Sequence, residues 1–297
     1  MGSSWTVTPE PQLRAAARRK IGPERGEPIS WIGWLRIGLR GVGLLIALLI
    51  CVPLHYAYRT VHYGSPFPKL FLRVACRLCG ARLRVHGVPL KRDVFFVANH
   101  LSWIDILALG GASGTAFVAK AELGVAPLVG WLARINRTVF VSREDRLGVA
   151  EQINRLREAL ADNWSITVFP EATTTDGKSL LPFKTSMLRV LEPPPPGVLV
   201  QPVVLDYGGD IGEWIGWIGT ESGVDNAKRL LARRGAFRLD VFYLEPFDPR
   251  DFAGRKAIAA EARARIVPAL EARLGKPLRP FAQVVGPVRY VPPDRAA

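Results

Sequence analysis

The stretch DVFFVANHLSWIDILAL, residues 93–109, places a strand, a turn and a helix directly after one another. Its first half, FFVA, is typical of a buried strand, and ILAL near its end is typical of a buried helix. Between these two parts His100 follows Asn99, and Asp105 comes five positions after the histidine. The whole chain has only four histidines. A histidine at the end of a strand, with a carboxylate close behind it, is therefore a candidate for chemistry.

The spacing of His100 and Asp105 determines how they can meet. Positions five apart in a regular α-helix lie about 140° apart around its axis, so the two side chains do not share a helix face. They meet if His100 lies in the turn and Asp105 in the first turn of the helix, and Ser102 and Asp105 have the capping-box spacing that predicts such a boundary. Asp105 would then accept the Nδ1 proton, leaving Nε2 as a general base for a substrate hydroxyl. The alternative is a helix cap beside an ordinary loop histidine.

Six short apolar runs after residue 80 predict strands, and helical patterns occur between and after them. The runs cover residues 93–99, 114–120, 137–143, 165–170, 198–207 and 237–247, and the helical patterns cover 145–162 and 254–274. This alternation predicts an α/β fold with a mixed, largely parallel sheet flanked by helices. Several runs lead into polar residues: His100, Lys120, Arg143 and Glu171. Because ligands bind at the carboxyl ends of strands in open α/β sheets, we expect these four residues to share one site.

The composition divides the chain into three parts. Residues 1–30 are basic and rich in Pro and Gly, which predicts a flexible tail, and residues 31–80 form a membrane-associated helical segment. Residues 81–297 contain the strand and helix patterns of the predicted catalytic domain.

The apolar segment has 18 consecutive residues without Asp, Glu, Lys or Arg, from Gly41 to Tyr58. That length is near the lower limit for crossing a membrane. Pro53 and His55 interrupt the run. Both a spanning helix and a helix lying in the membrane plane fit this pattern.

The formal net charge is +14, which predicts a polyanionic partner such as nucleic acid, an anionic membrane surface or a phosphorylated substrate. No nucleic-acid-binding motif is present, and the apolar segment has no role in such a protein. Three cysteines argue against a disulfide framework. Cys76 and Cys79 have the spacing of half a zinc site, with His86 as the one nearby third ligand, but no second pair follows. Two buried or interfacial thiols fit better than a metal site.

These residues give the chain a resemblance to the glycerolipid acyltransferase family of the 1-acylglycerol-3-phosphate O-acyltransferase type. It is especially similar to bacterial members, including the acyltransferases that complete ornithine lipids. Four motifs occur in the family's order over roughly residues 85–210: N-H-x4-D at Asn99, His100 and Asp105; a strand ending at Arg143; F-P-E-x-T from Phe169 to Thr173; and a Val-Pro-Val-like strand around Pro202.

One residue departs from the family pattern. Ala172 stands where the third motif usually has glycine. If this position needs a positive φ, alanine is strained there. If glycine serves only to allow a close approach, the methyl group narrows the acceptor pocket.

The resemblance implies a mechanism. The hydroxyl of a lysophospholipid such as 1-acyl-glycerol-3-phosphate attacks an acyl thioester, with His100 as general base and Asp105 as its orienting partner. The chain contains no G-x-S-x-G nucleophile motif, in agreement with direct attack. A backbone amide stabilises the oxyanion. No metal and no cofactor is required beyond acyl-CoA or acyl-ACP as co-substrate.

The predicted substrate-binding residues are Lys120, Arg143, Glu171 and Thr173. Arg143 would clamp a phosphate or carboxylate, Glu171 and Thr173 would contact acceptor hydroxyls, and Lys120 would add positive potential. Each has a structural alternative: a solvated lysine, a surface arginine, a turn carboxylate and an ordinary loop threonine. The tryptophans at positions 103, 131, 214 and 217 are interpreted as packing residues.

The implied partners are membrane lipids, a lyso-lipid acceptor, and acyl carrier protein or a CoA thioester, with no nucleic acid. The implied location is the bacterial inner membrane, with the catalytic domain on the cytoplasmic face, where each basic residue near anionic lipid contributes about 1 kcal/mol. Two other hypotheses remain: an acyltransferase for lyso-ornithine lipid, and a catalytically silent lipid-binding protein of the same fold.

Overall fold

A computed structural model describes residues 21–62, 64–125, 127–141 and 165–281. Its centre is a seven-stranded sheet in the order β1-β7-β6-β2-β5-β3-β4. In the described part of the chain, β6 and β7 pair antiparallel and every other neighbouring pair is parallel. The strands are β1 (Ala81–His86), β2 (Val94–Ala98), β3 (Ala116–Lys120), β4 (Val139–Val141), β5 (Ser165–Val168), β6 (Leu199–Asp206) and β7 (Phe237–Tyr243). The predicted mixed, largely parallel sheet is confirmed.

The helices cover both faces of this sheet. They are α2 (Trp31–Arg59), α3 (Phe67–Leu78), α4 (Ile104–Ser113), α5 (Ala121–Val125), α6 (Pro127–Ile135), α8 (Gly209–Ile215), α9 (Gly223–Ala232) and α10 (Gly254–Leu274), with short 3₁₀ helices η1 (Thr185–Leu191) and η2 (Pro249–Asp251). Helix α10 matches the helix predicted over residues 254–274. The helix predicted over residues 145–162 lies outside the described residues.

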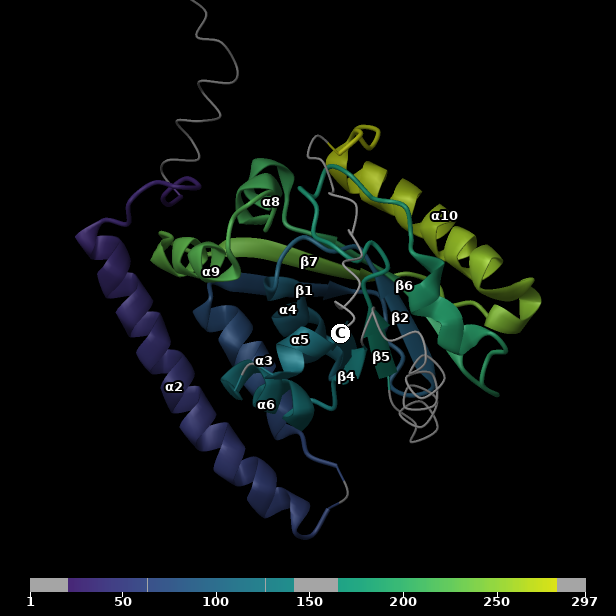
Figure 1. Ribbon diagram of the computed structural model, residues 1–297, viewed down its shortest axis with the longest axis horizontal. Coiled ribbons are helices and arrows are strands. Elements are labelled where there is room, and N and C mark those ends of the chain that lie inside the picture. The colour runs from purple at the N-terminus through teal and green to yellow at the C-terminus, as the bar shows by residue number, and fades with distance from the viewer. Residues whose placement is uncertain (1–20, 63, 126, 142–164, 282–297) are drawn as a thin grey trace, which may run out of the picture.

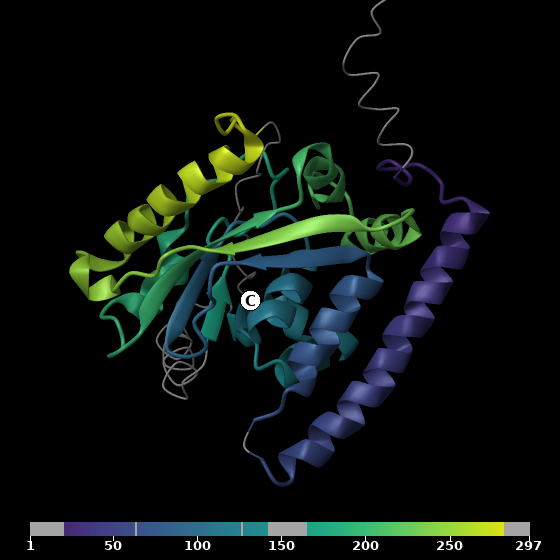
Figure 2. The same ribbon diagram turned by 180° about the vertical axis from the view of Figure 1, so that it is seen from behind.

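The sheet separates two apolar layers, and β2 contributes to both. Phe95 and Val97 pack in the layer covered by α10 and η1, whereas Phe96 and Ala98 pack in the layer covered by α3, α4, α8 and α9. In Figures 1 and 2, α10 lies on one side of the sheet, and α3 and α4 lie on the other. Such a strand reads as a continuous apolar run because both of its faces are buried. This double burial explains why FFVA signalled the fold so clearly.

Strand β1 is the strand that the sequence patterns did not predict. It lies at the edge of the sheet, and its side chains are mostly half-buried or exposed. Arg82 and Arg84 are exposed along it. Charged residues on an edge strand discourage pairing with other chains, and they also remove the apolar signal of a strand.

Helix α2 is fastened to the side of the domain. It contacts α3 and α9, and both views show it running alongside α3 (Figures 1 and 2). Arg36 donates to the Ala232 carbonyl at 3.3 Å, and Arg40 donates to the Leu230 and Leu231 carbonyls. These carbonyls belong to the last turn of α9, whose unpaired acceptors and negative dipole end favour cations. Arg36 and Arg40 thus hold α2 against the domain.

One side of α2 faces the domain along most of the helix, and the remaining sides are apolar. Its buried residues are Gly33, Ala47, Cys51 and His55. Exposed large apolar side chains occupy the other sides, including Leu35, Leu39, Val42, Leu45, Ile46, Leu49, Ile50 and Leu54. Among the described residues, α2 is the one helix long and apolar enough to cross a membrane.

Candidate active site

The site forms where three neighbouring strands end. Strands β6, β2 and β5 are adjacent and parallel, so their carboxyl ends meet at one edge of the sheet. This arrangement brings together His100 after β2, Glu171 after β5 and Tyr207 after β6. Helix α4 begins at Ile104, which places Asp105 in its first turn.

A buried carboxylate orients the ring of His100. The Nδ1 atom of His100 lies 2.8 Å from Oδ2 of Asp105, whose side chain is fully buried. The backbone amides of Leu101 and Ser102 also donate to Oδ2, at 2.7 and 2.9 Å, and the hydroxyl of Tyr207 donates to Oδ1. These donors replace the water that burial removes from the carboxylate. Because Asp105 accepts from Nδ1, the proton of a neutral His100 lies there and Nε2 is a free base.

Tyr207 is a residue of this site that the sequence analysis missed. Its ring is buried, and burial together with the nearby Asp105 carboxylate raises its pKa well above the usual value. The phenol therefore stays protonated and donates to the carboxylate. The signal in the sequence was its position at the carboxyl end of the run predicted over residues 198–207.

Two further contacts hold the end of β2. Asn99 bridges β2 and β6, since its Nδ2 donates to the Leu205 carbonyl at 3.0 Å and its Oδ1 accepts from the Leu205 amide at 2.8 Å. The ring of His100 stacks on Phe169, with centroids 4.0 Å apart. The His100 side chain remains 18% exposed, so the ring is open to a substrate from one side.

Glu171 holds the backbone of the turn that carries His100. It is 1% exposed, and its two oxygens accept from the backbone amides of His100 at 2.9 Å and Leu181 at 2.8 Å. The amide of Thr175 donates to the His100 carbonyl at 2.8 Å. The loop after β5 therefore binds both backbone polar groups of His100. Burial raises the pKa of Glu171 to about 8, against the amide hydrogen bonds that lower it.

Replacing Glu171 with glutamine is expected to change how stability depends on pH. Between the usual carboxyl pKa of 4.5 and about 8, the folded protein keeps a proton on Glu171 that the unfolded chain has released. The free energy of unfolding therefore falls as pH rises through this range, by up to about 1.4 kcal/mol per pH unit. Denaturant unfolding at a series of pH values should show a shallower slope for Glu171→Gln than for the wild type. Identical slopes would show that this carboxyl does not titrate in the range.

Ala172 adopts a left-handed backbone conformation, with φ of 59°. Its amide donates to the Phe169 carbonyl at 3.0 Å, which closes the turn after β5. Of the two reasons considered for a glycine here, the structure supports the need for a positive φ.

The variant Ala172→Gly is expected to raise the free energy of unfolding by about 0.5–1 kcal/mol. Glycine relieves the left-handed strain of a residue with a Cβ, and its larger unfolded-state entropy offsets part of the gain. Denaturant unfolding measures the change. The matched control is Ala260→Gly, at an exposed position of α10, where the same substitution should cost about 1 kcal/mol. A loss of stability at both positions would contradict the strain at Ala172.

Of the other three predicted site residues, the structure describes two, Thr173 and Lys120. Thr173 is half-buried in the loop that follows Glu171. Lys120 is the last residue of β3, two strands from β2 in the sheet. Arg143 lies outside the described residues. His100, Asp105 and Glu171 are brought together, and substrate binding by Lys120, Arg143, Glu171 and Thr173 stays a prediction.

An apolar cavity of about 380 Å³ adjoins this site, within the usual size range of ligand pockets. It is lined from six elements: α2, α3, α4, α6, β3 and β4. Phe117 of its lining lies parallel to Phe169, which stacks on His100. A continuous aromatic contact therefore leads from the cavity to the histidine. The sequence patterns did not reveal this cavity, because its walls come from segments far apart in the chain.

Cys76 and Cys79 lie in the core as free thiols. Burial raises the pKa of each to about 12. No cluster of metal-ligating side chains occurs in the part of the chain that the structure describes.

An oriented histidine beside an apolar cavity suits an enzyme that moves an acyl group to a hydroxyl, and comparison with known proteins agrees with this class. The acyltransferase family model matches residues 82–206. Lyso-ornithine lipid O-acyltransferase of Rhizobium meliloti is 35% identical over an alignment of 259 positions that covers 82% of this chain and 88% of the relative. The chain therefore belongs to the acyltransferase family, with lyso-lipid acyltransferases as its relatives.

Two further comparisons concern the type that acts on glycerol phosphates. The 1-acyl-sn-glycerol-3-phosphate acyltransferase of Neisseria gonorrhoeae is 38% identical over 97 residues, 32% of this chain and 38% of the relative. The crystal structure of the 1-acyl-sn-glycerophosphate acyltransferase PlsC from Thermotoga maritima aligns with a TM-score of 0.59 and 22% identity, over 81% of this chain and 97% of that one. This likeness shows that the two proteins share a fold.

Proposed function

We propose that the protein transfers a fatty acyl group from an acyl thioester to the free hydroxyl of lyso-ornithine lipid. The observation that carries this proposal is the match to a lyso-ornithine lipid O-acyltransferase over 82% of the chain. The relative named for 1-acylglycerol-3-phosphate matches over 32%. A lysophospholipid such as 1-acyl-glycerol-3-phosphate is the second candidate acceptor, because the four sequence motifs are shared with that type.

The site geometry supports a general-base mechanism. Nε2 of His100 removes the proton of the acceptor hydroxyl while the hydroxyl oxygen attacks the carbonyl carbon of the thioester. The C–S bond then breaks, the new ester bond remains, and the imidazolium returns its proton to the leaving thiolate. Asp105 stabilises the imidazolium that forms between these steps. The contacts from Leu101, Ser102 and Tyr207 keep that carboxylate in place.

The apolar cavity is suited to the acyl chain. Its lining is almost entirely apolar, and burying each methylene of a chain contributes about 0.8 kcal/mol. The cavity begins at the aromatic residues next to His100 and extends to Cys51 and His55 of α2. If the thioester carbonyl lies near His100, the acyl chain extends through the cavity toward α2.

The attachment of α2 supports a helix that lies in the membrane plane. It is held to the domain from Gly33, near its start, to His55, near its end. If the helix stood upright through a bilayer, α3 and α9 would enter the membrane with it, and α3 carries Lys69 and Arg73. With α2 in the plane, its exposed apolar sides enter one leaflet and the site stays at the surface. We place the protein at the cytoplasmic face of the bacterial inner membrane, where acyl thioesters are available.

Lipid mass spectrometry of reconstituted reactions tests this function. Full-length protein in detergent–lipid micelles receives lyso-ornithine lipid or 1-acyl-glycerol-3-phosphate, each with acyl-ACP and with acyl-CoA. We expect the highest kcat/KM with lyso-ornithine lipid. A preference for the glycerol phosphate would replace the proposed acceptor, and absence of product with every pair would favour a silent lipid-binding protein.

A further inference from the structure

Trp103 belongs both to the turn that leads from His100 to α4 and to the wall of the apolar cavity. It directly precedes α4, and it lines the cavity together with Ile106 and Leu107. Positions three and four residues apart share one face of a helix. Asp105, which is fully buried, lies on a different face and contacts His100. One helical turn therefore presents the partner of the base on one side and the cavity wall on another.

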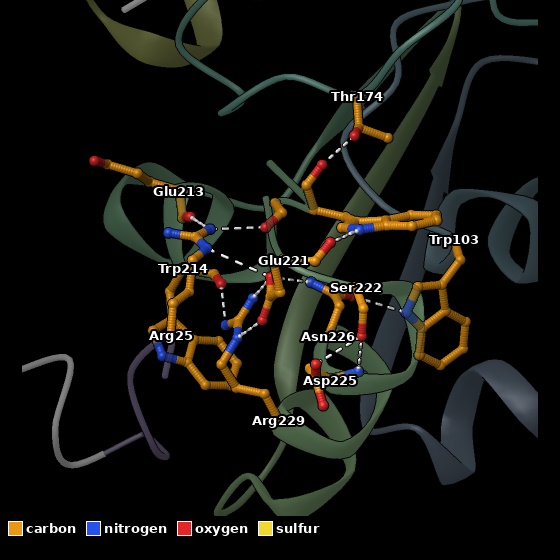
Figure 3. A network of polar contacts seen from close by, with 12 residues as sticks. Arg25, Trp103, Thr174, Glu213, Trp214, Glu221, Ser222, Asp225, Asn226 and Arg229 are labelled. Atoms are coloured by element: carbon orange, nitrogen blue, oxygen red, sulfur yellow. Dashed lines mark hydrogen bonds and ion pairs between the residues drawn. The ribbon is translucent and has the colours of Figure 1, made fainter. Parts of the chain in front are cut away.

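A hydrogen bond fixes the orientation of this indole. Nε1 of Trp103 donates to Oδ1 of Asn226 on α9, at 3.0 Å (Figure 3). Because this is the only polar atom of the indole, its carbon surface is left for the cavity. Rotation of the ring would break this bond and take away the donor that Oδ1 of the fully buried Asn226 accepts from.

Asn226 is held at its other end by a buried ion-pair network (Figure 3). Its Nδ2 donates to Oε2 of Glu221 at 2.9 Å, and Arg229 donates to both oxygens of Glu221, at 2.6 and 2.9 Å. Arg25, which precedes α2, lies 3.5 Å from the same carboxylate. The amide of Asn226 therefore cannot turn without breaking a contact of a buried charge. Trp103 lies in the turn before α4, and through Asn226 this network holds its indole rigidly in place.

We propose that Trp103 is a specificity-determining residue, whose indole, held by Asn226, forms the cavity wall next to the catalytic base and selects which acyl chains are transferred. The proposal rests on the proposed function, because it assigns the acyl chain to the cavity. Trimming the indole adds space beside the base into which the part of the chain near the carbonyl can bend, so that a longer chain fits the same cavity. Removing its support lets the ring move and weakens discrimination between chains.

Trp217 offers a matched control. Its Nε1 donates to the Glu221 carbonyl at 2.8 Å, so it also joins an indole to the segment that carries the network. It does not line the cavity, and it is 36% exposed. Trp217→Phe and Trp103→Phe each remove one indole N–H bond, but only the second changes the cavity wall.

The experiment is a competition assay with the full-length protein. An equimolar mixture of lauroyl, myristoyl, palmitoyl and stearoyl thioesters is offered with the preferred lyso-lipid, and the products are quantified by mass spectrometry. We expect Trp103→Ala to shift the ratio of kcat/KM values toward longer chains by about tenfold. Trp103→Phe should cause a smaller shift in the same direction, Asn226→Leu should broaden the distribution, and Trp217→Phe should keep the wild-type distribution.

An unchanged distribution in both Trp103 variants, with circular dichroism showing folded protein, would overturn the proposal. A shift in Trp217→Phe equal to that in Trp103→Phe would also overturn it, because the effect would then follow from the lost hydrogen bond alone. If Trp103→Ala does not fold, Trp103→Phe and Asn226→Leu still decide the question. Failure of the wild type to acylate any lyso-lipid would instead contradict the proposed function.

Discussion

Replacing His100 with alanine is expected to lower kcat for acyl transfer by about a thousandfold, with little change in KM for the thioester. General-base catalysis typically contributes about 10² to 10⁴ in rate, and no other described side chain takes the place of Nε2 beside Asp105. In the proposed mechanism other residues bind the acyl chain and the thioester, so binding should persist. Steady-state kinetics with acyl thioester and lyso-lipid measure both parameters.

The chain contains a matched control for this experiment. His86 and Asp240 form a second histidine–aspartate pair, with Nε2 2.7 Å from Oδ1, between the neighbouring strands β1 and β7. His86 stacks on Phe242 and is remote in the sheet from the end of β2. His86→Ala should leave kcat within about twofold of the wild type. Equal losses in the two variants would mean that histidine removal acts through stability, and full activity of His100→Ala would remove the general base from the mechanism.

The second large effect is expected from Asp105→Asn, which should lower kcat by a thousandfold or more, as is typical when the orienting carboxylate of a catalytic histidine becomes an amide (about 10⁴). The amide nitrogen cannot accept hydrogen bonds, yet all four contacts described for Asp105 require an acceptor. If the amide nitrogen takes the place of Oδ2, His100 must adopt the other tautomer and the amides of Leu101 and Ser102 lose their acceptor. If it takes the place of Oδ1, the Tyr207 hydroxyl must turn to accept. In both cases the negative charge that would stabilise the imidazolium is lost. The free energy of unfolding should also fall, by about 1–3 kcal/mol. Kinetics and denaturant unfolding on the same preparation separate the two effects.

Tyr207→Phe is the companion variant for Asp105. It removes the donor to Oδ1 and leaves the contacts of Oδ2 with His100, Leu101 and Ser102. A hydrogen bond to a charged group is worth about 1.5–3 kcal/mol, so we expect kcat to fall by about ten- to a hundredfold. If Asp105→Asn were no more damaging than Tyr207→Phe, the carboxylate would serve to hold the loop and not to stabilise the imidazolium.

Much of this architecture was predictable because its signals are local. The run FFVA is apolar on both faces, and its strand lies at the centre of the sheet. His100 and Asp105 are five residues apart, so the geometry of one turn and one helix start allowed their contact to be predicted, beside the alternative of a helix cap next to an ordinary loop histidine. The edge strand β1 was missed for the opposite reason, since its basic side chains face solvent.

The parts that could not be predicted depend on residues distant in the sequence. Tyr207 reaches Asp105 across 102 positions, and Trp103 reaches Asn226 across 123. The loop after β5 also uses Glu171 to bind the amide of His100, 71 positions away. Residue patterns record which face of a helix or strand is apolar, and from these the class of fold and the pair of catalytic candidates follow. They do not record which helix ends beside which strand. The packing of the assembled core therefore selected the partners of Asp105, the walls of the cavity and the support of Trp103.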